Sequence, residues 1–389
     1  TRWCTTLAFW WVLRLLWPSH LAQTTWAAFL FALYPGFKQQ FISVTYSNAF
    51  IIYCLFLVSF ALMILAVRKP RLYWLLMILS IATSGVSMFI AEYFFGLELL
   101  RLLVLWYLQK DTSTQNSRLA RKVALQWLPY FLLMLAFLVW RVFLTETPRG
   151  DIVLFDQLAA SPLSGVYNLL RTILNDIFEV AVLAWVYTVD RGRIMMMNRS
   201  GSLPAYLAVI ISGLIFSLVF LARLYNKPAG DEKSAAQQAS WGRQACLGGA
   251  AALLVAGWPF WVTNLQIELF FPRDRFTLPM MIGASLVLAG LIALLKRPQV
   301  QSALIVALLA GLAAGMHYED ALQYRSEWTL LKNWFWQMSW RAPKIEEGTT
   351  ILSGDLYLDY YSDNSLTSPL NWTYAHDNKA INIPYLFMD

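Results

Sequence analysis

Eight uncharged stretches of about twenty residues each dominate this chain of 389 residues. They cover residues 15–37, 44–67, 72–91, 123–140, 201–222, 244–267, 276–295 and 298–316. A helix needs roughly 20 apolar residues to cross ~30 Å of hydrocarbon, where only backbone bonded within its own helix is stable. With shorter segments at 3–13, 93–109 and 168–188, the stretches predict an all-α polytopic membrane bundle of about 10–11 transmembrane helices.

The composition agrees with a membrane environment. The chain is 58% hydrophobic and only 14% charged, so most of it belongs to one bundle. The net charge is +7, and basic loops of a membrane protein indicate orientation and contact with anionic lipid rather than nucleic acid. Cys4, Cys54 and Cys246 lie in separate segments without metal-ligand spacing, which is typical of small apolar packing residues and predicts no metal site.

Basic residues gather in four loops, which we place on the cytoplasmic side. These loops contain residues 68–71, 110–122, 223–243 and 296–297. The turn at 92–96, the loop at 268–275 and the tail after 317 then lie outside. Residues 123–222 contain three candidate helices where an even number of crossings is needed. We therefore expect the stretch with Arg171, Asp176 and Glu179 to lie partly along the interface.

The composition changes near residue 317. We predict a transmembrane domain over residues 1–317 and a small extracytoplasmic α/β cap over residues 318–389. Residues 318–341 mix aromatic and charged side chains, which predicts an amphipathic helix that ends at Ala342-Pro343. Residues 349–353 predict a short strand.

Charged residues within spanning segments are costly unless paired, so they are candidates for function. Glu98 and Arg101 stand three apart on a helix, which predicts an ion pair. Glu92 lies at an outer turn without a partner nearby in the sequence, so we expect it to face a water-filled cavity. Asp176 and Glu179 share a helix face. They could hold a metal ion, act as acid and base, or form the polar face of an interfacial helix.

The strongest candidate site is the outer loop that reads Phe-Phe-Pro-Arg-Asp-Arg-Phe at residues 270–276. Arg273 and Arg275 could grip phosphate oxygens bidentately, with Asp274 orienting one arginine or binding a cation. Phe271 and the other two phenylalanines would line the path of a lipid tail. The alternative is a loop of snorkelling basic residues, which would need no acid between them.

Several weak motifs follow one another in a familiar order. An apolar helix ends in Leu-Tyr-Pro-Gly-Phe at 33–37, and Glu92 marks the next outer turn. The tail contains Trp-Gln-Met-Ser-Trp-Arg-Ala-Pro at 336–343 and Gly-Thr-Thr-Ile-Leu at 348–352. This layout resembles the bacterial GT-C glycosyltransferases, which take sugars from polyprenyl-phosphate carriers at the outer membrane face. The resemblance implies the plasma (inner) membrane, and an upstream helix and outer loop that carry the catalytic acid.

The resemblance implies a hexosyl- or pentosyltransferase that moves a sugar from a polyprenyl-phosphate donor to an acceptor. Glu92 and Asp274 are then the candidate catalytic carboxylates, and a divalent cation or an arginine would stabilise the departing phosphate. The missing acid loop leaves open a non-catalytic subunit of the same fold, packed with other membrane subunits. A transporter would need more buried charges inside its spans than this chain has.

Overall fold

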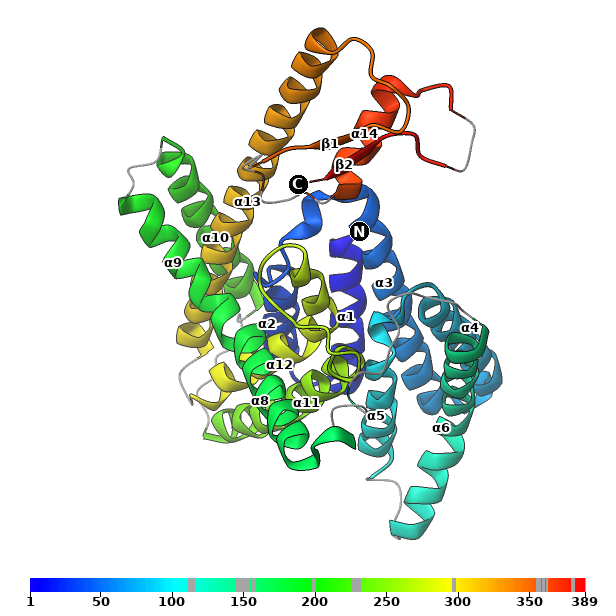
Figure 1. The fold of residues 1–389 in the computed structure, drawn as a ribbon. Helices are drawn as coiled ribbons and strands as arrows, with labels where there is room; N and C mark the ends of the chain where they lie inside the picture. Colours follow the sequence, from blue (N-terminus) through cyan, green and yellow to red (C-terminus); the bar gives the residue numbers. More distant parts are fainter. Residues whose placement is uncertain are drawn as a thin grey trace. The chain divides into compact units, whose positions relative to one another are not determined.

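The computed structural model describes residues 1–110, 116–144, 159–197, 201–224, 232–295, 299–354, 363–378 and 382–388, with Leu154, Leu358 and Tyr361. Within these residues the chain is helical apart from one two-stranded sheet, which confirms the predicted all-α polytopic fold class (Figure 1). The chain divides into two compact units, Thr1–Met316 and His317–Asp389.

The first unit is built from helices. They are α1 (Arg2–Leu16), α2 (Leu21–Ala32), α3 (Ser43–Arg68), α4 (Tyr73–Ile90), α5 (Leu100–Gln109), α6 (Asn116–Val139), α8 (Pro162–Phe178), α9 (Ala184–Met197), α10 (Leu203–Leu224), α11 (Glu232–Val262), α12 (Met281–Leu294) and the first part of α13 (Gln299–Arg341). In the described part of the chain, seven helices are long and apolar enough to cross a membrane: α3, α4, α6, α10, α11, α12 with the 3-10 turns before it, and α13.

Seven is fewer than the 10–11 spans expected, and the first uncharged stretch explains part of the difference. Residues 15–37 do not form one helix, because α1 ends at Leu16 and α2 begins only at Leu21. Pro18 lies in the break, where its missing N–H interrupts no helical hydrogen bond. The 12 residues of α2 extend only about 18 Å, too short to cross alone.

The region between residues 123 and 222 contains only two long apolar helices among its described residues, α6 and α10. The third candidate consists of α8 and α9, joined by a π-helical segment at Glu179–Leu183. Neither α8 nor α9 is long and apolar enough to cross a membrane, so the described residues between the basic loops contain an even number of long apolar helices. The interfacial position of this stretch stays a prediction.

The core of the first unit contains a close helix pair, α11 and α12, which lie side by side (Figure 1). A Cβ on Gly249 would lie 2.8 Å from the Gly283 carbonyl oxygen, and one on Gly290 would lie 2.8 Å from that of Gly242. Small residues at these four positions let the two backbones approach, as is common between membrane helices. Around this pair α3 packs against both α1 and α4.

The change in composition at residue 317 does not end a helix, because α13 continues as one helix to Arg341. In the second unit, β1 (Thr350–Leu352) pairs in parallel with β2 (Leu386–Met388), and α14 (Asp363–Tyr374) packs on β2. The predicted strand at 349–353 is confirmed. The small core of this unit comprises Leu366, Leu370, Tyr385 and Phe387, with the end of α13 against it.

Candidate functional site

Asp274 is a buried carboxylate that joins two loops of the first unit. It belongs to the 3-10 segment η7 (Arg273–Met280) and has no exposed surface. Its Oδ2 accepts the backbone N–H of Lys38 at 2.8 Å, and its Oδ1 accepts the side-chain amide of Gln39. These donors replace the water that a buried charge loses. Asp274 thus positions the Lys38 loop, and it does not contact either arginine beside it through a described ion pair.

Arg275 continues this hydrogen-bonded chain. Tyr46 donates its hydroxyl proton to Oε1 of Gln39, and the same hydroxyl is hydrogen-bonded to Arg275. The half-buried guanidinium lies 5.0 Å from the centroid of the Phe276 ring, and its Nε is buried. Arg275 also interacts electrostatically with Tyr93. Arg275 is therefore held by Tyr46 and Phe276, and its charge acts on Tyr93, the residue after Glu92.

Arg273 points elsewhere than Arg275. Its side chain is exposed, and its Nη1 donates to the carboxylate of Glu268. The same Nη1 donates to the amide oxygen of Gln266 at 2.5 Å. The two arginines therefore do not converge on one position in the described structure. Phe271 is half-buried, and the Phe271–Pro272 peptide bond is cis.

Glu92 lies in a cavity of about 440 Å³ between α3, α4 and the end of α6. Its carboxylate accepts a 2.8 Å ion-paired hydrogen bond from Nε of Arg141, and its side chain is 52% exposed. Thr45, Asn48 and Tyr93 are further polar residues of its lining. The rest of the lining is mainly apolar, with Met88, Phe89, Ile90, Phe137 and Trp140 among its side chains. We call this the Glu92 cavity. Its lining suits an amphiphile.

Sequence reasoning missed Arg141, which is 49 residues from Glu92. The signal was present, because Arg141 directly follows the uncharged stretch at 123–140 and so ends a span at the same side as Glu92. What the sequence did not provide is the contact between α4 and α6 that makes the two residues neighbours (Figure 1). The predicted Glu98–Arg101 ion pair is present, 2.5 Å long and fully buried.

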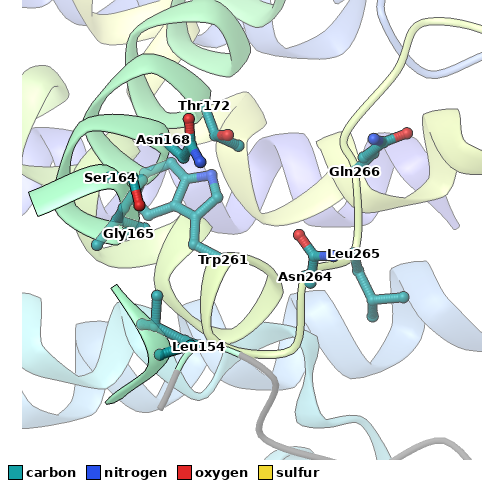
Figure 2. Close-up of a pocket in the computed structure, with 11 residues that line it drawn as sticks. Leu154, Ser164, Gly165, Asn168, Thr172, Trp261, Asn264, Leu265 and Gln266 are labelled. Atoms are coloured by element: carbon teal, nitrogen blue, oxygen red, sulfur yellow. The ribbon is translucent and has the colours of Figure 1, made fainter. Parts of the chain in front are cut away.

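A second cavity, of about 460 Å³, lies between α8 and the turn after α11 (Figure 2).

Asp176 and Glu179 share a helix face, but each has a different hydrogen-bond partner. Asp176 accepts the indole N–H of Trp261 at 2.8 Å, whereas Glu179 accepts the backbone N–H of Leu269 at 3.1 Å. Among the described residues no group of three or more His, Cys, Asp or Glu could hold a metal ion. The structure thus gives these two acids separate structural partners.

Burial raises the pKa of Asp176 to about 6, although the hydrogen bond from Trp261 lowers it and the nearby Glu179 raises it further. Burial also raises the pKa of Glu179. Both carboxylates lie outside the seven long apolar helices. A carboxyl that titrates near neutral pH beside a cavity is a candidate for function, and ion-pair networks within a fold produce the same shift.

Comparison with family models, with curated proteins and with solved structures finds no match to this chain. The site is therefore interpreted from its own chemistry. Two of its cavities carry this chemistry: one with a carboxylate, one arginine and apolar side chains, and one polar cavity without basic side chains in its described lining.

Proposed function

We propose that this chain is a GT-C-like membrane glycosyltransferase that moves a sugar from a polyprenyl-phosphate donor to an acceptor at the outer face of the plasma membrane. The observation that carries the proposal is the Glu92 cavity, whose lining combines a carboxylate and an arginine with aromatic and aliphatic side chains. A donor with an anionic head, a sugar and an isoprenoid tail combines the same kinds of chemistry.

Each group of the cavity has a role in such a transfer. Arg141, with Arg275 behind Tyr93, would bind and stabilise the phosphate. The acceptor hydroxyl oxygen would attack the anomeric carbon as the bond from that carbon to the phosphate oxygen breaks, and the bonding pair would leave with the phosphate. The acceptor proton would pass to the Glu92 carboxylate, which is exposed to the cavity.

The alternative is a non-catalytic subunit of the same fold in a larger membrane assembly. The observation in its favour is the Glu92–Arg141 ion pair, because a carboxylate held by an arginine already has a structural partner. In that case the cavity would hold lipid without chemistry.

The decisive experiment measures sugar transfer from polyprenyl-phosphate-linked hexoses and pentoses by membranes that contain the full chain, with release of polyprenyl phosphate as the readout. Glu92→Gln removes the base and keeps the shape, so we expect at least a hundredfold loss of turnover. Arg141→Lys should weaken donor binding, because the planar fork is lost while the charge stays.

The matched control is Glu347→Gln, an exposed carboxylate of the second unit that should leave turnover unchanged. Donor binding without turnover in the parent protein would favour the non-catalytic subunit. Neither binding nor turnover with any donor would contradict both functions.

A further inference from the structure

The second cavity, between α8 and the turn after α11, is lined by uncharged polar side chains. Ser164, Asn168 and Thr172 come from α8, and Asn264 and Gln266 from the turn (Figure 2). The three α8 residues are spaced by four, so they lie on one face of the helix. The volume of about 460 Å³ is in the range of pockets that hold a small ligand.

A neighbouring face of α8 is apolar and exposed. The exposed side chains are those of Leu163, Tyr167, Leu170, Leu174 and Phe178, with Leu163 89% exposed. A helix with one such face and one polar face lies in the membrane interface, with its apolar side toward the acyl chains. With α8 in that position, its polar stripe would border a cavity at the level of the lipid headgroups.

Several of the cavity's hydrogen-bonding groups are available to a ligand. Among the described residues, no hydrogen bond is made by the side chains of Asn168, Thr172 or Asn264, all of which line the cavity. Asn264 has a positive φ of 55°, a conformation that asparagine tolerates better than most residues. Its amide is thereby presented on a tight turn directly after α11.

Trp261 forms a fixed wall of the same cavity. Its indole N–H donates to Asp176 at 2.8 Å, and its six-membered ring packs over Gly257, where a Cβ would approach within 2.3 Å. The ring is 4% exposed and so does not move freely into the cavity. A rigid aromatic wall with amides and hydroxyls around it suits a ring that carries several hydroxyl groups.

The described lining of the cavity contains no charged side chain. Charges of both signs flank it, since Asp176 accepts the indole N–H of Trp261 and Arg171 is exposed on α8 beside Thr172. An anionic ligand would therefore find no basic side chain in the described lining to compensate its charge, whereas the lining of the Glu92 cavity includes Arg141.

We infer that this second cavity binds the uncharged, hydroxyl-rich ring of a neutral saccharide, which is the acceptor of the transfer. The identification as acceptor rests on the proposed function, and the binding itself does not. The two cavities are connected through neighbouring residues. Phe260 directly precedes Trp261, and the Phe260 ring contacts Tyr93, the residue after Glu92. A donor phosphate and a neutral acceptor would thus be selected by one cavity with charged side chains in its lining and one without them.

The test measures saturation-transfer-difference NMR of soluble glycosides with the full chain in phosphatidylcholine nanodiscs. The probes are the methyl glycosides of glucose, galactose and mannose, with methyl glucuronide as the anionic counterpart. We expect at least one neutral glycoside to bind, and methyl glucuronide to bind at least tenfold more weakly than methyl glucoside if the latter binds.

Asn168→Ala and Thr172→Val each remove one neutral hydrogen bond, so we expect about three- to tenfold weaker binding from each. The matched control is Asn175→Ala, which removes an exposed asparagine of α8 outside the cavity lining and should change nothing. The inference is overturned if no neutral glycoside binds, if the glucuronide binds as well as its neutral counterpart, or if the cavity variants match the control.

Glu92→Gln separates this inference from the proposed function. Neutral glycosides should bind this variant as they bind the parent, whether or not transfer is detected. Binding with no transfer by the parent would retain the saccharide site and remove its role as acceptor site. Transfer by the parent without glycoside binding to the cavity would retain the enzyme and refute the site.

Discussion

Removing Glu98 should destabilise the first unit more than removing both members of its ion pair. Arg101 has no exposed surface, and it contacts Glu98 through Nε at 2.5 Å and through Nη2 at 3.0 Å. Its guanidinium also lies 4.2 Å from the ring centroid of Phe60 and 4.1 Å from that of Tyr130. Glu98→Ala would leave this charge enclosed by aromatic rings and without a counter-ion.

The expected magnitude follows from this burial. Breaking a buried ion pair by deleting one partner costs about 3–5 kcal/mol, because the remaining charge is desolvated and uncompensated. Arg101→Met in the Glu98→Ala background removes that charge and places an apolar side chain between the two rings. The double variant should therefore recover about 2 kcal/mol or more of the loss, although it carries one change more.

The assay is reversible unfolding of the purified chain in mixed micelles, with the free energy of unfolding obtained for the parent, both single variants and the double variant. Glu347→Ala, an exposed carboxylate of the second unit, controls for loss of charge alone. A Glu98→Ala cost below about 1 kcal/mol, or single costs that add up to the cost of the double variant, would refute the reasoning.

Three other predictions concern the candidate sites and the topology. Asp274→Asn should lower the free energy of unfolding by about 1.5–3 kcal/mol in the same assay, because one hydrogen bond to a charged acceptor is lost and an N–H₂ group faces a donor. As the pH rises from about 4 to about 6, the free energy of unfolding of the parent protein should fall relative to that of Asp176→Asn. A cysteine at Ser365 should react with an impermeant thiol reagent in intact cells, and one at Lys69 only after permeabilisation.

The sign of the pH effect follows from the raised pKa of Asp176. Its carboxyl ordinarily has a pKa of 3.8, and burial raises the folded value to about 6, so the folded state binds the proton more tightly than the unfolded chain does. Its contribution to stability is present at low pH and is lost as the pH rises through the folded value. A difference between parent and variant that is flat or of opposite slope would contradict this.

The other two predictions have equally direct refutations. Unchanged stability of Asp274→Asn would mean that its two hydrogen bonds do not hold the Lys38 loop. Labelling of the Ser365 cysteine only after permeabilisation would reverse the proposed orientation. It would also place the second unit on the cytoplasmic side.

The sequence by itself determined that this protein has the apolar stretches of a membrane protein, and it determined most of the long helices. The uncharged stretches at 44–67 and 72–91 became α3 and α4 almost unchanged, because a helix that crosses lipid must be long, apolar and internally hydrogen-bonded. The strand at 350–352 and the helix end before Ala342 were predicted for the same kind of local reason. Local pattern also paired Glu98 with Arg101, since they are one helical turn apart.

Tertiary structure alone decided the partners of the polar side chains that define the candidate sites. Glu92 and Arg141 are 49 residues apart, and Asp176 and Trp261 are 85 apart. Their meeting depends on which helices pack together, and hydrophobic stretches of similar length carry little information about that choice. The loop at 270–276 shows the same limit. Its composition predicted a shared phosphate site. In the fold, Asp274 is buried against Gln39, because a buried charge needs a compensating partner, and Arg273 is exposed and paired with Glu268.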